Sequence, residues 1–164
     1  MYITYDDYCK LYDPIEEKLF NRLAFDACRV MDIHTTGIDN VRKLKIFMPT
    51  EEYDVSAVKH CAARLINILH QLQEAETAAA LGRGYTETEQ GLQKRIISRV
   101  EAGNEAISYS ETKNANSTID AAVADKTVRD KLLADIVKES LAGVEDANGV
   151  NLLYMGRYPR RCTC

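Results

Sequence analysis

The residues best suited to chemistry in this chain are its five cysteines and three histidines. His60 and Cys61 are adjacent, and on a helix neighbouring side chains diverge by about 100°. That spacing alone cannot form a nucleophile and base dyad. None of His34, His60 and His70 has an acidic residue three positions before it, so the Glu-x-x-His pattern of di-iron bundles is absent.

The cysteine positions favour packing over chemistry. Cys9, Cys28 and Cys61 fall on or beside helical apolar faces, where a free thiol behaves as a small hydrophobic group. Cys162 and Cys164 form a CxC pair at the C-terminus, but two ligands are too few for a closed metal site. We expect no metal site.

Nucleotide and hydrolase motifs are also absent. The chain has no HExxH, no GxGxxG and no GxxxxGK[ST]. The paired acids Glu16–Glu17 and Glu51–Glu52 fall in expected first helical turns, where the helix dipole favours carboxylates. We therefore expect a protein that is not an enzyme, with no catalytic residue and no cofactor.

Length and composition indicate one globular domain over residues 1–164. The chain carries a net charge of -4, and 46% of its residues are hydrophobic. This balance argues against a dedicated nucleic-acid binder, which would show a concentrated basic face. No apolar run is long enough to span a membrane, and no signal peptide pattern opens the chain, so neither a membrane protein nor a secreted one is expected.

The first part of the chain predicts helices. Thr4, followed by two aspartates, predicts a cap and a short helix. Asp13 and Pro14 predict the start of a long amphipathic helix, which should end near Gly37 with that glycine in a left-handed cap. Residues 39–47 allow another short helix.

Two further helices are expected downstream. The longest begins with Thr50 or Asp54 as its cap and ends around Gly82. Residues 82–94 read as an irregular connection. A last helix begins at residue 116 or 117 and reaches Leu141, with Gly143 just past its end. The segment "VNLLYMG" near the C-terminus is expected to be a strand or an extended packing segment.

Between these helices, "RIISRVEAGNEAISYS" (residues 95–110) predicts a β-hairpin. A two-residue turn of Gly103 and Asn104, with glycine first, has type II′ geometry. The register that follows pairs Val100 with Ile107, Arg99 with Ser108 and Ser98 with Tyr109. One face would then carry Ile96, Val100, Ile107 and Tyr109.

A two-stranded ribbon alone is marginally stable in water, and its edges stay open to pairing. Its apolar face therefore either folds onto its own helices or serves as an arm for a partner. The fold class predicted is all-α, a small helical bundle with one projecting β-hairpin or extended loop. The hairpin arm spans about 95–111, and a flexible tail spans about 156–164.

Several stretches together resemble the head-tail connector proteins of long-tailed bacteriophages and prophages. They are the opening "YITYDDYCKLYD", then "FNRLAFDACRVMDIHT", a second long helix after "MP", the hairpin segment, and the ending "VNLLYMGRYP". This ending is similar to the family's short "LLYRG", with Met155 in place of the usual arginine. The resemblance covers nearly the whole chain, and the CxC ending with Arg160 and Arg161 departs from it.

The resemblance implies a virion protein that forms a ring beneath the portal and extends the DNA channel towards the tail. A dodecamer is expected from portal symmetry, although the isolated chain can be a monomer. The implied partners are the portal, the tail-proximal head completion protein and DNA bound without sequence specificity. The implied locations are the head-tail interface of the virion and, during assembly, the host cytoplasm. The implied interface residues are Ile96, Val100, Ile107, Tyr109, Leu153, Tyr154 and Arg157.

Two other readings stay open. A small DNA-packaging or DNA-binding protein, such as a terminase small subunit, would need a basic recognition helix, and no expected helix has that charge. A helical-bundle enzyme would be indicated by a bound metal.

Overall fold

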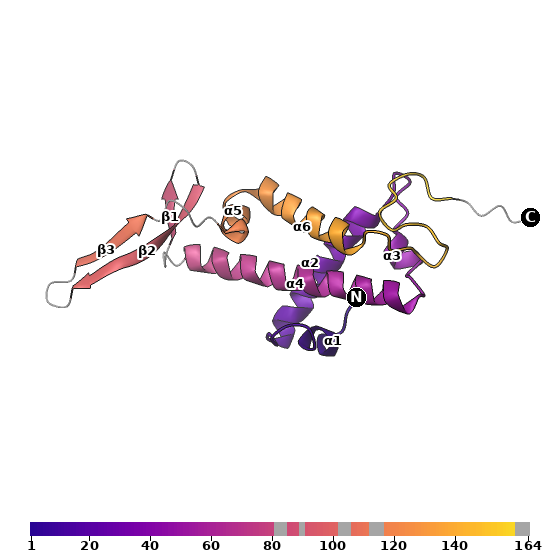
Figure 1. The fold of residues 1–164 in the computed structure, drawn as a ribbon, viewed down its shortest axis with the longest axis horizontal. Helices are drawn as coiled ribbons and strands as arrows, with labels where there is room; N and C mark the ends of the chain where they lie inside the picture. Colours follow the sequence, from indigo (N-terminus) through magenta and orange to yellow (C-terminus); the bar gives the residue numbers. More distant parts are fainter. Residues whose placement is uncertain (81–84, 89–90, 102–105, 112–116, 160–164) are drawn as a thin grey trace, which may run out of the picture. The chain divides into compact units, whose positions relative to one another are not determined.

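The computed structural model describes residues 1–80, 85–88, 91–101, 106–111 and 117–159, with side chains for 1–78 and 117–159. These residues form mainly helices, which confirms the all-α class (Figure 1). They group into two compact units: Met1–Leu69 with Leu133–Cys164, and His70–Leu132. We call them unit 1 and unit 2 and describe each by itself. The single domain over 1–164 stays a prediction.

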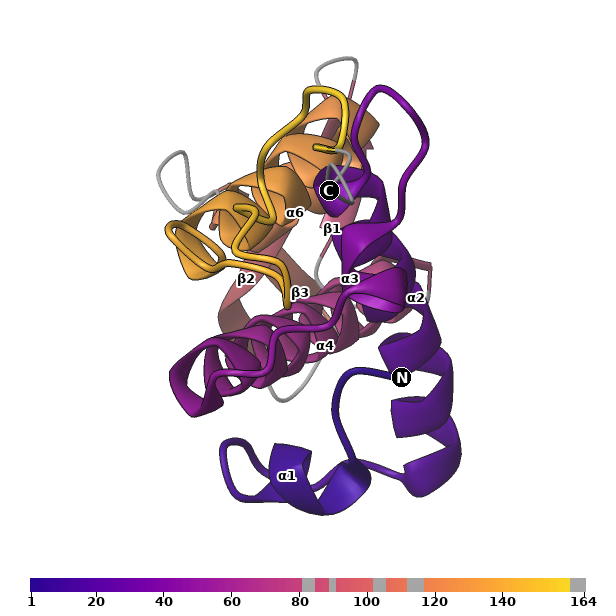
Figure 2. The same ribbon diagram turned by 90° about the vertical axis from the view of Figure 1, so that its right-hand side faces the viewer.

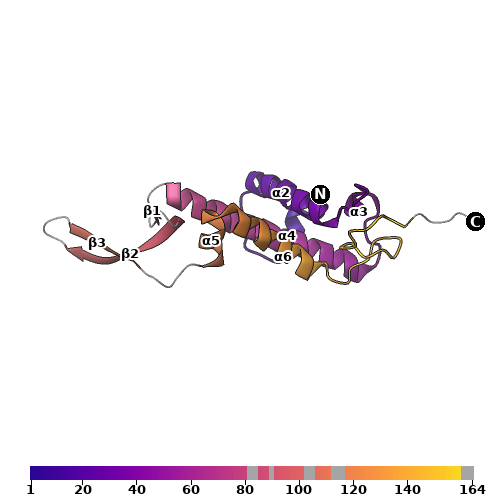
Figure 3. The same cartoon turned by 90° about the horizontal axis from the view of Figure 1, so that it is seen from above.

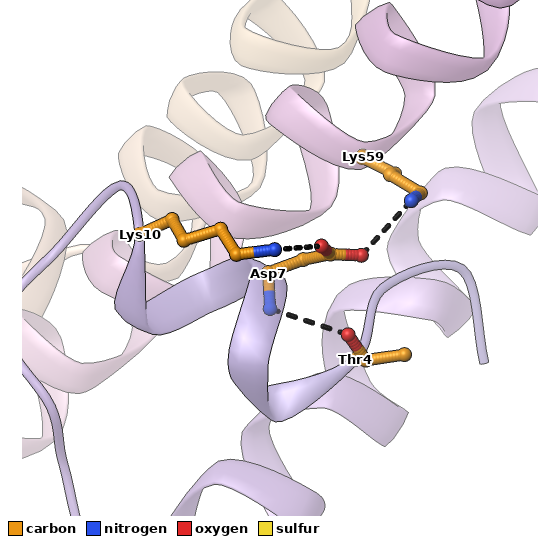
Figure 4. Close-up of polar contacts among 4 residues, drawn as sticks. All are labelled: Thr4, Asp7, Lys10 and Lys59. Carbon is orange, nitrogen blue, oxygen red and sulfur yellow. Dashed lines mark hydrogen bonds and ion pairs between the residues drawn. The ribbon is translucent and has the colours of Figure 1, made fainter.

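Unit 1 opens with the short helix α1 (Tyr5–Cys9), as predicted. The Thr4 hydroxyl accepts a hydrogen bond from the Asp7 amide at 3.2 Å, so Thr4 is the expected cap. Figure 4 shows the Asp7 carboxylate between two lysines. Lys59 Nζ donates at 2.9 Å and Lys10 Nζ at 3.3 Å. These bonds, that of Lys59 foremost, lower the pKa of Asp7 to about 2.

The long helix α2 (Glu17–Thr35) ends near Gly37 as predicted, but the caps at its two ends differ from the prediction. It begins three residues after Pro14, with Glu16 as the N-cap and no side-chain cap bond, so Asp13 is not the cap. Gly37 does not have the predicted left-handed conformation, because Thr36 leaves the helix in an extended one. The Thr35 and Thr36 hydroxyls instead donate to carbonyls of the last turn, at 2.9 and 2.5 Å.

Two more helices continue unit 1. The helix α3 (Lys43–Ile46) is shorter than the predicted 39–47. The longest helix, α4 (Glu52–Ala80), ends where predicted but begins between the two predicted caps, so that Asp54 lies within its first turn. Its residues up to Leu69 belong to unit 1. Figure 1 shows α2 crossing this first part of α4, and Figure 3 shows α2 alongside it from above. At the crossing, aliphatic and small side chains of both helices are buried, which suits close helix packing.

The helix α6 (Lys126–Ser140) enters unit 1 at Leu133. Arg64 of α4 and Glu139 of α6 form an exposed ion pair at 3.1 Å. Between these helices Cys61 is fully buried, and burial raises the pKa of its thiol to about 12, as suits a packing role. The largest buried apolar side chains of unit 1 are Tyr8, Phe20, Met31, Leu44, Val58, Leu65, Ile66, Val137, Leu141 and Leu152.

In unit 2 the single predicted helix after residue 116 is two helices. The Ser117 hydroxyl caps α5 (Thr118–Ala124) by accepting a hydrogen bond from the Asp120 amide at 3.1 Å. Residue 117 is one of the two predicted starting positions. Asp125 is extended and ends α5, and its carboxylate then accepts from the Thr127 amide at 2.7 Å. A short polar residue that bonds its own backbone favours such a break.

Unit 2 also contains the strands β1 (Tyr85–Thr88), β2 (Gly91–Glu101) and β3 (Ala106–Glu111). They pair antiparallel in the order β1-β2-β3, so the expected irregular connection 82–94 contains strand residues. Val100 lies opposite Ile107 and Arg99 opposite Ser108, as predicted. Tyr109 lies opposite Ile97 and not Ser98, because the register shifts between Ile97 and Arg99. The Gly103–Asn104 turn lies outside the described residues.

The Asp7 contacts predict a specific acid sensitivity. A carboxylate whose folded pKa lies below its ordinary 3.8 stabilises the fold fully above pH 4, and this stabilisation is lost as pH falls through about 2. Asp7→Asn should therefore lower the free energy of unfolding at pH 7, and the gap to wild type should close between pH 4 and 2. Urea unfolding at each pH measures this gap.

Asp6→Asn is the matched control, since Asp6 lies in the same turn and makes no ion pair among the described residues. Its unfolding free energy should stay parallel to that of wild type throughout. A gap for Asp7→Asn that is the same at pH 7 and pH 2 would contradict the assignment.

Candidate interaction surface

Residues 144–159, here called the C-terminal segment, lie against the stretch between α2 and α4. Figure 2 shows this yellow segment beside the α2–α3 connection. The Ile38 amide donates to the Met155 carbonyl at 3.0 Å, and the Ala147 amide donates to the Phe47 carbonyl at 3.2 Å. The segment is extended and turned, with one isolated bridge between Glu145 and Asn151, so of the two expected forms it takes the packing segment and not the strand.

A buried lysine fixes this segment. Lys43 is only 1% exposed, and its Nζ donates to the Asn151 carbonyl at 3.1 Å and the Tyr154 carbonyl at 2.5 Å. Burial lowers the pKa of the Lys43 ammonium, and the nearby Asp146 carboxylate opposes that shift. The ammonium also lies 5.9 Å from the centre of the Tyr154 ring, within cation–π range.

A polar cluster organises the turn before these carbonyls. The buried Asp146 carboxylate accepts from the amides of Asn148 and Val150 at 2.8 and 3.0 Å, and from the Tyr158 hydroxyl at 2.6 Å. The Tyr158 ring stacks on Phe47 with centroids 4.8 Å apart. Tyr158, which the sequence assigned to the tail, therefore packs on the stretch that precedes α4.

Close backbone contact explains two glycines here. A Cβ on Gly37 would lie 2.6 Å from the Gly156 carbonyl oxygen, and one on Gly156 would lie within 2.2–2.9 Å of the Tyr154 ring. The Tyr158 amide also donates to the Asp39 carboxylate at 2.8 Å, which lowers the pKa of Asp39. Gly37 in "HTTG" therefore allows the C-terminal segment to pack closely against this turn.

The surface above this anchored backbone is apolar. Ile38 is 77% exposed and Tyr154 47% exposed, and Met155 and Arg157 are also exposed. We call these four residues the C-terminal patch. Because the amide of Ile38 bonds the carbonyl of Met155, segments more than 100 residues apart in the chain contribute to one surface. Large apolar side chains that are exposed on a fixed backbone are candidates for an interaction site.

The sequence named three residues of this segment as interface residues. Two of them, Tyr154 and Arg157, are exposed, and Leu153 is half-buried. Sequence reasoning missed Ile38, whose partner lies far away in the chain, and gave Met155 only as a departure from the family pattern. No sequence signal links Ile38 to Met155.

The other four predicted interface residues lie in the strands of unit 2. Val100 and Ile107 are opposite one another, Ile96 is opposite Ser110, and Tyr109 is opposite Ile97. The apolar face that these four residues were predicted to share stays a prediction, because the structure describes side chains only for residues 1–78 and 117–159. The described residues hold no group of three or more potential metal-ligating side chains, and no described helix is long and apolar enough to cross a membrane.

Comparisons of the chain with protein-family models, with curated proteins and with solved structures found no match.

The Lys43 contacts predict a large effect from one substitution. Lys43→Met keeps the aliphatic stem but leaves the Tyr154 carbonyl without its Lys43 donor, while the Asn151 carbonyl keeps only the Tyr154 amide as a donor. Leaving a buried polar group unpaired costs about 1–3 kcal/mol. We expect the free energy of unfolding to fall by about that amount, and hydrogen exchange to accelerate at residues 151–158, measured by urea unfolding and mass spectrometry.

Lys45→Met is the control, because Lys45 is exposed in the same short helix. It should change neither quantity beyond a few tenths of a kcal/mol. Equal effects of the two substitutions would show that Lys43 does not anchor the segment.

Proposed function

We propose that this chain is a non-enzymatic head-tail connector of a long-tailed bacteriophage or prophage. The resemblance across nearly the whole sequence supports this assignment, and the helical bundle is the fold that the resemblance implies. The observation that carries it is the C-terminal patch. Its residues Tyr154, Met155 and Arg157 lie in the ending "VNLLYMGRYP", the stretch expected to contact neighbouring proteins.

The patch has the composition of a protein–protein contact. Aromatic residues, methionine and arginine are enriched in interfaces, and Tyr154, Met155 and Arg157 are of these types. The Lys43 bonds hold the backbone beneath them, so binding has little chain entropy left to lose there. This arrangement suits a surface that meets a partner of fixed shape.

In this proposal twelve copies form a ring beneath the portal, at the head-tail interface of the virion, after assembly in the host cytoplasm. The ring contacts the portal above, the tail-proximal head completion protein below and DNA in its channel. Ile96, Val100, Ile107 and Tyr109 contact adjacent subunits or the portal. The net charge of -4 suits a conduit, because strong binding to phosphates would hinder the passage of DNA.

Co-assembly with the portal protein encoded in the same genome tests the proposal. We expect co-expression to give a stable complex with a closed ring of this chain on the portal, seen by electron microscopy. The paired change Ile38→Asp and Met155→Asp places two charges in the patch and should lower the recovered complex about tenfold or more. Leu11→Asp, at an exposed apolar residue outside the patch, is the control.

The patch variant must keep the helical circular dichroism of wild type, so that loss of complex is not loss of fold. A folded wild-type chain that forms no complex with the portal would overturn the proposed function. A patch variant that co-assembles like wild type would show that the C-terminal patch does not contact the portal.

A second substitution tests the hairpin part of the proposal. Ile107→Asp places a charge opposite Val100 in the β2–β3 pairing. Helicity should be unchanged, because the helices lie outside the strands, and co-assembly with the portal should be abolished. Ser108→Asp, one position along the same strand, is the control. Wild-type levels of complex for Ile107→Asp would contradict an interface role for the hairpin.

A further inference from the structure

A second surface of unit 1 lies along α2. The N-terminus, α2 and the stretch that leads into α3 surround a broad hollow of about 1370 Å³. Its apolar wall includes Phe25, which is 68% exposed, and Ile33, which is 59% exposed. These residues are eight positions apart on one helix, which is about 12 Å at 1.5 Å per residue. We call this hollow the α2 groove.

The charged side chains of the α2 groove are mainly basic. Arg29 lies four residues from both Phe25 and Ile33, on the same helical face, and Arg42 and Lys45 line the groove from the α3 side. Arg29 and Lys45 are exposed and make no ion pair or side-chain hydrogen bond within the described residues. The groove also contains Asp32, but its carboxylate accepts the Tyr2 hydroxyl at 2.5 Å.

The same unit presents a group of the opposite kind at the start of α4. Tyr53 is 83% exposed, and Glu51 and Glu52 beside it are exposed as well. The helix dipole accounts for acids in this first turn, but not for an aromatic ring left in water. Tyrosine is among the residues that most often dominate binding energy at protein interfaces. We call Glu51, Glu52 and Tyr53 the acidic knob.

We propose that the acidic knob of one copy docks into the α2 groove of a second copy. The Tyr53 ring lies between Phe25 and Ile33, and the carboxylates of Glu51 and Glu52 face Arg29 and Lys45. The charges of the two surfaces are opposite, each surface has exposed apolar or aromatic side chains, and both belong to unit 1. This inference rests on the proposed function, in which copies of the chain associate side by side.

The geometry of such a contact is that of a ring. One patch meets a different patch on the neighbour, so a pair of copies still has one free groove and one free knob. A head-to-tail contact of this kind closes into a ring when its rotation closes. Opposite charges at the rim also fix which surfaces meet.

Photo-crosslinking tests the contact directly. Tyr53 is replaced by p-benzoylphenylalanine in one batch, which is mixed with nitrogen-15-labelled wild-type chain at about 1 mM, where even a millimolar contact is substantially formed. We expect cross-links between the light residue 53 and heavy peptides from Phe25–Ile33 or Arg42–Lys45. The isotope label separates contacts between copies from contacts within one copy. The same reagent placed at Leu11 is the control and should not mark the groove.

Charge reversal provides the second arm. Glu51→Lys with Glu52→Lys, made in the cross-linking chain, should lower the yield of groove cross-links about tenfold against wild-type partner. A partner carrying Arg29→Glu and Lys45→Glu should restore the yield, because the signs are then opposite again. Circular dichroism of each variant checks the fold. Restoration of yield cannot arise from general loss of stability.

The outcomes separate this inference from the proposed function. Absence of groove cross-links, both at about 1 mM and in the portal complex, would overturn the knob-in-groove contact even if rings form. Lack of restoration by the paired reversal would also overturn it. Groove cross-links in a chain that never joins a portal would instead keep the contact and overturn the connector function.

Discussion

The ammonium of Lys43 and the two carbonyls that it bonds are the constraint on which the candidate surface depends. The C-terminal segment has almost no regular secondary structure to satisfy its backbone. A buried carbonyl needs a donor, and a buried ammonium needs acceptors. Lys43 gains two acceptors from the segment and the segment gains a donor from Lys43, so each stabilises the other in its place, together with the backbone bonds from Ile38 and Ala147. The exposure of Ile38 and Met155 at fixed positions follows from this mutual dependence.

Unit 1 offers surfaces of two different kinds. The C-terminal patch is apolar with one arginine, whereas the α2 groove and the acidic knob combine apolar area with opposite charges. Burial of apolar area contributes binding free energy, and the pattern of charges determines which partner binds. A subunit that must meet copies of itself and unlike proteins needs surfaces that are not interchangeable. The two kinds of surface in this unit suit the connector role that we propose.

Local signals in the sequence predicted most of the helices. The caps at Thr4 and Ser117 and the apolar stripe of α4 were predictable, because each depends on residues within a few positions of one another. The break at Asp125 and the extended exit at Thr36 were not predicted, since hydrogen bonds of a single side chain decide them. The register shift in β2 was missed because the prediction paired the two strands residue for residue, whereas Ser98 is an extra residue between Ile97 and Arg99.

The candidate site was predictable only in part. Tyr154 and Arg157 could be named from their types and from the family pattern, but the burial of Lys43 depends on carbonyls more than 100 residues away. The requirement for glycine at position 37 likewise depends on a carbonyl more than 100 residues away. This loop position would ordinarily accept many residues, yet the carbonyl of Gly156 leaves no room for a Cβ. A saturation scan of the gene would thus find few substitutions accepted at Gly37, although it lies in a surface turn, because the obstacle is a backbone carbonyl that any residue at position 156 would also have.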